Sequence, residues 1–443
     1  MTRLAEGMNR LLWGAPALIL ILGVGLYLTI RLGAVQLTLF PRAVKAFFAQ
    51  LRKRGGGEGV SSFQAMCTAL GATVGTGNLV GVAGAICLGG PGAIFWMWLC
   101  GLLGMVTKFA EATLAVRYRI KAKDGWRGGP MYTMLGGLGS RWMPAAKLYC
   151  MFGVIAAFGV GNATQINAIT TSVRGLLPIQ SWILGLFLAA LVAILLFGGA
   201  ASIGAAAERL VPFAAGGYIL LCAGVLAVKA QAIPGAFFSI LQGAFSPRAV
   251  TGGALGSAFQ ALRIGCSRGV FTNEAGMGTA SIAHGAAEVD HPCQQGLMGM
   301  MEVFLDTIVI CTLTALVILV SGVPIPYGKD VGGELTTQAF SSVFGTGAVV
   351  YLTLSLILFA LATILGWGLY GARCAEFLFG PKSWKWFALA QTAMVLFGAV
   401  ADTGAVWALA ETVNGLMVLP NLITLAALTP ELCRLTKEYK KSR

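Results

Sequence analysis

The string GTGN at residues 75–78 interrupts an apolar stretch, residues 63–89, that is long enough to cross a membrane. A second interruption, NEAGMG at residues 273–278, lies inside the apolar stretch 252–286. Unwound backbone inside a membrane must be buried or line a polar cavity, because its N–H and C=O groups need partners. Two such breaks at corresponding places in two halves of a chain are typical of a transporter's substrate site. The pair therefore predicts a carrier of a small solute; the alternative is that both breaks are packing kinks.

The composition excludes most classes of soluble protein. Of the 443 residues, 57% are hydrophobic and 11% are charged, whereas soluble domains carry roughly 25% charged residues. The net charge of +14 does not indicate nucleic-acid binding, because the basic residues lie beside apolar spans rather than in an aromatic patch. The ten cysteines form no C-x-x-C pair and read as packing residues. The chain has only two histidines, no H-E-x-x-H string and no ring of filter residues, so neither an enzyme nor a channel is indicated.

Eleven stretches are apolar and long enough to span a membrane, which takes about 20 residues. The first stretch is not followed by an A-x-A cleavage site, so we expect a retained span rather than a signal peptide. Residues 234–246 are amphipathic and are expected to lie at the membrane interface or to form a re-entrant piece. The expected spans are residues 12–30, 63–89, 91–116, 146–170, 181–200, 208–229, 252–286, 297–321, 346–370, 384–402 and 406–429.

The order of the spans predicts an all-α membrane protein with an inverted repeat. After the first span, ten remain as five and five, and each half opens with a broken span. We expect an extra N-terminal helix with a basic loop, two repeats and a basic tail, at residues 1–60, 61–230, 231–430 and 431–443. With the N-terminus outside and the C-terminus in the cytoplasm, 22 of the 31 basic residues fall in inner segments and six in outer segments.

Three strings carry a resemblance to a known family. They are VGTGNLVGVAGAICLGGPGAIFWMW at 74–98, GGPMYTM at 128–134 and RGVFTNEAGMGTASIAHGAA at 268–287. In these strings the chain resembles the alanine or glycine:cation symporter family, the sodium:alanine symporters of the amino acid-polyamine-organocation superfamily. The resemblance implies a LeuT-like fold of five plus five helices with one extra N-terminal helix. It also implies Na⁺-coupled uptake of alanine or glycine, in the inner membrane of a bacterium or archaeon, by a monomer that contacts lipid.

The first break is expected to hold the carboxylate of the substrate. A half-helix that starts at a break exposes N–H groups, and its dipole favours an anion. We expect Gly75 to let the backbone approach the ligand, and the amides of Thr76 and Gly77 to bind the carboxylate. Alternatively, the Thr76 hydroxyl bonds to its own helix. Gln165 matches a glutamine that the family carries near its substrate, and interhelical hydrogen bonding is its alternative role.

The second break and its surroundings are expected to shape the pocket. Met277 is a candidate wall, and Trp367 would cap a small pocket that favours glycine or alanine, unless it belongs to an interfacial aromatic belt. Three roles are open to Glu274, an intramembrane acid: tuning a cation site, tying the break to a neighbouring helix, or pairing with Arg268 or Arg263. A structural, gating role is favoured. Asp306 is a further gating candidate for which the sequence identifies no partner.

The coupling ion implied by the resemblance is Na⁺, which carbonyl oxygens at the end of a half-helix suit. For Asn78 and Asn273, which lie at the breaks, helix capping is the alternative role. Proton coupling, in a LeuT-fold carrier of another small zwitterion, also stays open. At one expected cation site the ligands are the carbonyls of Gly71 and Val74 and the hydroxyl of Thr363. At a second site, whose occupancy stays open, they are the Asn78 side-chain oxygen, the Thr73 carbonyl and the region of Asn273.

Two further polar groups lie near the spans. Lys108 and Glu111, three residues apart, are expected to pair on one helical turn. His284 and His291 lack a third ligand nearby, so a zinc site is not indicated, and proton coupling through them is an alternative.

Overall fold

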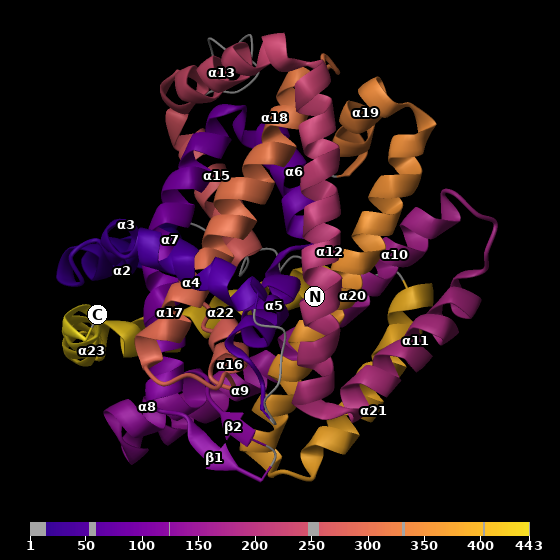
Figure 1. The fold of residues 1–443 in the computed structure, drawn as a ribbon. Coiled ribbons are helices and arrows are strands. Elements are labelled where there is room, and N and C mark those ends of the chain that lie inside the picture. Colours follow the sequence, from indigo (N-terminus) through magenta and orange to yellow (C-terminus); the bar gives the residue numbers. More distant parts are fainter. Residues whose placement is uncertain are drawn as a thin grey trace.

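The computed structural model describes residues 15–52, 59–123, 125–246, 257–329, 333–401 and 404–442. In this part of the chain the protein is a helical bundle with one short hairpin, in which β1 (Ile120–Ala122) pairs with β2 (Gly125–Arg127). Figure 1 shows α13 and α19 at one end of the molecule and the hairpin with α8 at the other. The first residues of the predicted spans 12–30 and 252–286 lie outside the described residues.

The N-terminal segment lies against the bundle rather than inside it. Helix α2 packs against α7 and α22, and the amphipathic α4 packs against α17. The predicted span at 12–30 therefore corresponds to a peripheral helix, as an extra N-terminal span requires. The elements are α2 (Ala15–Arg31), α3 (Val35–Thr38) and α4 (Phe40–Arg52).

The first half of the bundle opens with the predicted broken span. Helix α5 begins with a capping box, in which the Ser61 side chain accepts from the Gln64 N–H and the Gln64 side chain accepts from the Ser61 N–H. It meets the following helical piece at an angle of 50°. The elements are α5 (Ser62–Thr73), η1 (Gly77–Gly81), α6 (Val82–Gly89), α7 (Gly92–Arg117), α8 (Pro130–Leu138), η2 (Ser140–Trp142), α9 (Met143–Phe158), η3 (Gly159–Ala163), α10 (Thr164–Arg174), α11 (Ser181–Phe197) and α12 (Gly199–Val228).

The second half contains the second break, between α15 and α16. Helix α13 lies across one end of the bundle, which fits the interfacial alternative for residues 234–246 (Figure 1). Helix α19 was not predicted from the sequence. The elements are η4 (Ala230–Ala232), α13 (Ile233–Phe245), α15 (Ala258–Asn273), α16 (Ala280–His284), α17 (Pro292–Val303), η5 (Phe304–Cys311), α18 (Thr312–Val320), α19 (Gly333–Phe344), α20 (Thr346–Phe379), α21 (Ser383–Val400), α22 (Gly404–Ala427) and α23 (Thr429–Lys441).

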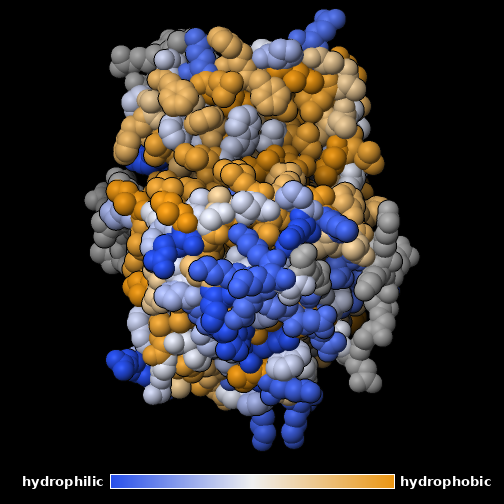
Figure 2. Space-filling model, turned by 60° about the vertical axis from the view of Figure 1, so that its left-hand side comes forward, coloured by the Kyte–Doolittle hydropathy of each residue, from blue (hydrophilic) through white to orange (hydrophobic). Residues whose placement is uncertain are grey.

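The lengths and hydropathies of the helices support some, but not all, of the eleven predicted membrane spans. Within the described residues, five helices are long and apolar enough to cross a membrane alone, and seven qualify if each bent pair forms one span. Shorter apolar helices such as α2 and α11 complete several of the other predicted spans. The number eleven therefore stays a prediction. Figure 2 shows hydrophilic side chains gathered over the lower half of one face and a mainly hydrophobic upper half.

At the centre of the bundle, helices α20 and η3 pack closely around Trp367. Trp367, on the 34-residue helix α20, is fully buried. A Cβ on Gly161 of η3 would overlap the side chain of Trp367. A glycine at this position therefore allows α20 to bring a large aromatic ring against η3, in the manner of small residues at membrane helix contacts.

Candidate functional site

A small cavity lies where the two breaks meet. Its volume is about 30 Å³, enough for one or two water molecules. All six residues predicted to bind substrate line it, which places segments far apart in the sequence around one space. The lining residues are Ala72, Thr73, Gly75, Thr76, Gly77, Val160, Gln165, Phe271, Glu274, Met277, Thr363, Trp367 and Asn414.

Three other predicted site residues, Thr73, Glu274 and Thr363, also line the cavity, and six lie outside it. Arg268 lies half-buried on α15, five residues before the helix ends, and Asp306 lies buried in η5. The remaining ones belong to the backbone or the asparagines of the breaks. The predicted residues that do not line the cavity are Gly71, Val74, Asn78, Arg268, Asn273 and Asp306.

The first break is closed by its own asparagine. Helix α5 ends at Thr73, and Val74 is extended. The Gly75 N–H donates to the Asn78 side-chain oxygen at 2.9 Å, and the Asn78 N–H donates to the Gly75 carbonyl at 3.2 Å. The side chain of Asn78 therefore makes the capping contact, which was the alternative to its predicted role at a cation site.

Asn78 also ties the first break to the second half of the chain. Its Nδ2 donates to Asp306 Oδ1 at 2.7 Å, and Asp306 Oδ2 accepts from the Thr307 hydroxyl at 2.8 Å. Thr307 in turn accepts from Asn273 Nδ2 at 3.1 Å, and Asn273 Oδ1 accepts from the Ala275 N–H. One buried chain of hydrogen bonds thus joins both breaks through η5. The sequence identified Asp306 without this partner.

The second break is held open by left-handed backbone. Glu274 ends α15 at φ 52°, and Gly276 and Gly278 follow at φ 97° and 79°, a region that favours glycine. The Glu274 carboxylate accepts from Trp367 Nε1 at 3.2 Å and from the Thr279 hydroxyl at 2.6 Å. Of the three roles considered for Glu274, the structure thus shows a contact that ties the break to a neighbouring helix.

Glu111, which the sequence analysis read as half of a local ion pair, binds the second break. Its Oε1 accepts from the N–H groups of Gly276 and Gly278, at 2.9 and 3.2 Å, and from Asn421 Nδ2 at 2.8 Å. The Asn421 side chain also donates to the Gly276 carbonyl. The predicted Lys108–Glu111 pair is wrong, because tertiary partners replace it. The sequence could have suggested a functional role for Glu111, because it is a carboxylate inside a predicted span. No local pattern in the sequence indicated that Asn421 would bind the second break.

Lys108 instead pairs with Glu302, part of a buried polar cluster with His284 and Gln295. Its Nζ lies 3.3 Å from Glu302 Oε1, and Glu302 Oε2 lies 2.8 Å from His284 Nε2. His284 Nδ1 contacts the Gln295 amide at 2.7 Å, and Gln295 Oε1 accepts from the Ser62 hydroxyl. Among the described residues, no group of three His, Cys, Asp or Glu side chains is arranged to hold a metal ion.

Two of the predicted cation ligands, Gly71 and Thr363, meet beside the cavity. The Thr363 hydroxyl donates to the Gly71 carbonyl at 3.0 Å and to the Phe359 carbonyl at 3.1 Å. A Cβ on Gly75 would lie 3.1 Å from the Thr363 oxygen. The Thr363 hydroxyl and the Gly71 carbonyl near the end of α5 are therefore adjacent, and oxygen atoms of this kind suit a hard cation. The Thr73 hydroxyl bonds within its own helix.

Two residues that line the cavity carry a buried amide oxygen without a hydrogen-bond partner in the described structure. They are Gln165 Oε1 and Asn414 Oδ1. Gln165 is fixed by its Nε2, which donates to the Val160 carbonyl at 3.2 Å. Buried polar atoms are nearly always hydrogen-bonded, so two unpaired acceptors beside one cavity indicate a ligand that donates. The sequence analysis missed Asn414.

The site is approached from the side of α19. A cavity of about 400 Å³, lined by residues of α10, α19 and α20, reaches Thr76, which also lines the small cavity. Thr336 of α19 donates to the Leu79 carbonyl at 2.7 Å and docks that helix on the first broken span. On the opposite side, the Tyr149 hydroxyl donates to the Met277 carbonyl at 3.0 Å.

Comparisons with known proteins agree with this architecture. A model of the sodium:alanine symporter family matches residues 1–443. The sodium/alanine symporter AgcS of Methanococcus maripaludis is 41% identical over 445 residues, which cover 99% of this chain and 97% of that protein. The amino-acid carrier protein AlsT of Bacillus subtilis is 37% identical over 428 residues, which cover 96% of this chain and 89% of that one.

A solved structure shows the same fold. The crystal structure of MhsT in complex with L-phenylalanine superposes with a TM-score of 0.55 at 15% identity, covering 86% of this chain and 99% of that chain. At this identity the likeness concerns the fold alone, which is that of a LeuT-type transporter. The match over the full length and the two relatives identify the family. The chain is a multi-pass membrane protein and belongs to the sodium:alanine symporter family.

Proposed function

We propose that this protein imports a small neutral amino acid, alanine or glycine, together with Na⁺. The observation that carries the proposal is the cavity of about 30 Å³ between the two breaks, closed by Trp367 and lined by two unpaired amide oxygens. With acceptors on one side and the start of a half-helix on another, the site offers a group for each end of a short zwitterion, and it must widen to admit one because its present volume holds one or two water molecules. The names of the relatives point to the same class of substrate.

The site offers a complementary protein group for each charged end of the zwitterion. The amides of Thr76 and Gly77 stand at the start of the second half of the broken span, where N–H groups and the helix dipole stabilise a carboxylate. The ammonium donates to Gln165 Oε1 and Asn414 Oδ1, whose lone pairs are otherwise unused among the described residues.

Substrate size is limited by Trp367 and Met277. Trp367 is fully buried, packs against Gly161 and is fixed by its hydrogen bond to Glu274. A side chain held on both sides cannot swing away without breaking a buried contact, so the pocket stays small. Met277 completes the wall from the second break.

Na⁺ is proposed to bind beside the first break. The Gly71 carbonyl and the Thr363 hydroxyl are 3.0 Å apart and come from opposite sides of the contact between α5 and α20. A cation between them links the two helices and aligns Gly75 and Thr76, so ion and amino acid each favour the binding of the other. Thr73, Val74, Asn78 and Asn273 are proposed as further or second-site ligands.

Transport is proposed to proceed by alternating access between the repeats 61–230 and 231–430. With the N-terminus outside and the C-terminus in the cytoplasm, the cavity at α19 faces the outside and the Tyr149–Met277 contact closes the inside. Each Na⁺ carried inward gains about 2.3 kcal/mol per 100 mV of membrane potential. We place this protein in the inner membrane of a bacterium or archaeon, surrounded by lipid, and functional as a monomer.

Uptake of radiolabelled alanine and glycine into proteoliposomes tests the proposal. An inward Na⁺ gradient is compared with an equal K⁺ gradient and with a proton gradient. Accumulation with Na⁺ alone supports the assignment, and its absence with every gradient refutes the substrate.

A proton-coupled carrier is the second candidate, favoured by His284, which lies buried between Glu302 and Gln295. It predicts uptake that a protonophore abolishes and that persists without Na⁺.

A further inference from the structure

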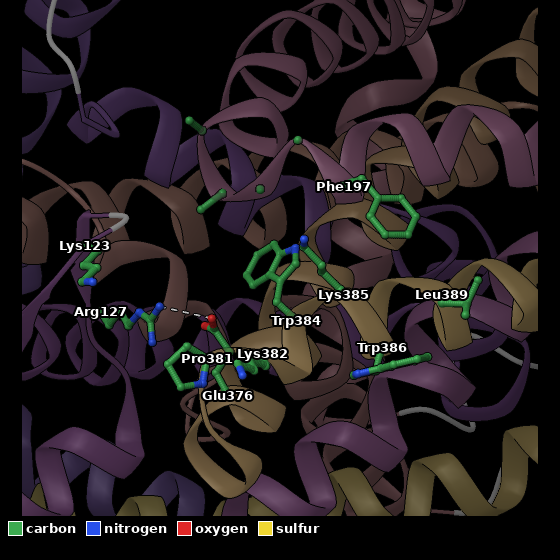
Figure 3. Close-up of a pocket in the computed structure, with 14 residues that line it drawn as sticks. Lys123, Arg127, Phe197, Glu376, Pro381, Lys382, Trp384, Lys385, Trp386 and Leu389 are labelled. Atoms are coloured by element: carbon green, nitrogen blue, oxygen red, sulfur yellow. Dashed lines mark ion pairs between the residues drawn. The ribbon is translucent and has the colours of Figure 1, made fainter.

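A cavity of about 990 Å³ lies at the same end of the bundle as the hairpin, well away from the proposed transport site. Four segments form it: the hairpin, the turn between α11 and α12, the end of α20, and the start of α21 (Figure 3). The basic loops that the sequence assigns to the cytoplasmic side contribute most of its rim. The lining residues are Lys123, Arg127, Phe197, Gly198, Gly199, Ala200, Ala201, Glu376, Pro381, Lys382, Trp384, Lys385, Trp386 and Leu389.

The rim of this cavity carries an excess of positive charge. Its four basic side chains come from two separate segments, Lys123 and Arg127 from the hairpin and Lys382 and Lys385 from the start of α21. Its one lining carboxylate, Glu376, is already engaged by two guanidinium groups, with Arg127 at 3.2 Å and Arg373 at 2.7 Å. Among the described residues, Lys123, Lys382 and Lys385 are exposed and have no ion-pair partner.

The opposite wall of the cavity is apolar and open. Phe197, Trp386 and Leu389 are 52%, 73% and 54% exposed. In Figure 3 Trp386 and Leu389 follow one another along α21, on the far side of Trp384 from Arg127. Trp384 itself is fixed, since its Nε1 donates to the Leu196 carbonyl at 2.9 Å and the Arg373 guanidinium lies 5.1 Å from its ring centre. The fixed Trp384 side chain thus lies between the hairpin residues Lys123 and Arg127 and the apolar side chains, with Lys385 on the Phe197 side of it (Figure 3).

We propose that this cavity binds one anionic phospholipid of the cytoplasmic leaflet. The phosphate lies among Lys123, Lys382 and Lys385, and the acyl chains run along Phe197, Trp386 and Leu389 towards the hydrocarbon region. Basic pockets at the cytoplasmic ends of membrane helices recognise such headgroups. A free phosphate would use the basic end alone and leave three large apolar side chains in water, at a cost of about 25 cal/mol for each Å² of apolar surface.

A lipid bound in this cavity would bridge the two halves of the chain. Helices α11 and α12 belong to the first half of the chain, whereas α20 and α21 belong to the second. A lipid in this place contacts both halves, so we expect it to stabilise the folded bundle more than bulk lipid does. The inference does not depend on which amino acid is transported.

Quenching of tryptophan fluorescence by brominated lipid tests the proposal. The full chain is reconstituted in phosphatidylcholine vesicles that contain a small fraction of either brominated phosphatidylglycerol or brominated phosphatidylcholine. We expect stronger quenching by the phosphatidylglycerol. The excess is lost in the charge variant Lys123→Gln/Lys382→Gln/Lys385→Gln and reduced in Trp386→Phe. The exposed position of Trp386 makes that second variant safe for folding.

A matched control keeps the test specific. Lys437→Gln/Lys440→Gln/Lys441→Gln in α23 removes the same charge from another basic segment and should retain the excess quenching. Equal quenching by both brominated lipids would overturn the proposal, as would loss of the excess in the control variant. Inorganic phosphate is added as a competitor, and displacement of the lipid by millimolar phosphate would assign the basic end to a soluble anion instead.

Discussion

Trp367 donates its indole N–H to Glu274 across the centre of the bundle, at 3.2 Å, and both side chains line the small cavity. The residue proposed to limit substrate size and the only carboxylate of the second break are therefore one hydrogen-bonded unit. Because Glu274 also accepts from Thr279, movement of the second break changes the position of the ring. Size selection and opening of the break are coupled through this contact.

Replacing Trp367 should relax the size limit. Trp367→Ala removes a fully buried ring and is expected to lower stability by about 3–5 kcal/mol. Competition of alanine uptake by valine and leucine is the measurement, and we expect both to become effective competitors. Trp367→Phe keeps most of the volume but loses the N–H, so it should retain the size limit. If the alanine variant folds and still rejects valine and leucine, another residue sets the limit.

Removing the carboxylate of Glu111 should release the second break. Oε1 of this residue accepts from two break amides and from Asn421, and hydrogen bonds to a buried charged group contribute about 1.5–3 kcal/mol each. Glu111→Ala should therefore lower the Tm strongly and abolish uptake. Glu111→Gln keeps an acceptor, so its Tm and uptake should lie between those of Glu111→Ala and the unmodified chain. Thr107→Val on the same helix is the control, because that hydroxyl donates to Leu103 of its own helix. Equal Tm values for Glu111→Ala and the control would contradict the role.

The unpaired oxygen of Asn414 predicts a loss of amino-acid affinity. Asn414→Leu has similar volume and no acceptor, so the Kd for alanine should rise about tenfold, which corresponds to about 1.4 kcal/mol. Asn414→Asp keeps the oxygen and adds charge, and alanine binding should persist. Titration of the purified variants with alanine at saturating Na⁺ measures both values. Unchanged affinity in Asn414→Leu would remove this residue from the ammonium site.

Thr363 should affect Na⁺ before it affects the amino acid. Thr363→Val is isosteric and lacks the hydroxyl that lies 3.0 Å from the Gly71 carbonyl, so half-maximal uptake should need about tenfold more Na⁺. Thr363→Ser keeps the oxygen and should resemble the unmodified chain. The Na⁺ dependence of alanine uptake is the readout. A higher alanine requirement at saturating Na⁺, with no change for Na⁺ itself, would argue that the hydroxyl serves the substrate.

The sequence predicted the architecture well because its signals are local. Glycine-rich strings mark the two breaks at residues 75–78 and 273–278, and long apolar stretches mark the major helices. Helix α19 was missed because it is short and mixed in polarity. In the structure it packs on neighbouring helices and docks on the first broken span, where the Thr336 hydroxyl donates to the Leu79 carbonyl.

The partners of the polar residues could not be predicted, because they lie far away in the chain. Asn78 meets Asp306 across 228 residues, and Glu111 meets Asn421 across 310. Local spacing favoured a Lys108–Glu111 pair, yet the break amides and Glu302 provide better-placed partners. Side chains that line the cavity from late helices, such as Asn414, have no sequence signal beyond being polar in an apolar span.

The dependence of alanine affinity on Na⁺ tests the central claim most directly. Binding of alanine to the purified protein is measured by calorimetry in Na⁺ and in K⁺ at equal ionic strength, and then with Thr363→Val. We predict much tighter binding in Na⁺ and a smaller Na⁺ effect in the variant, because the ion at Gly71 and Thr363 aligns the break that holds the carboxylate. The same Kd in both salts would contradict the account.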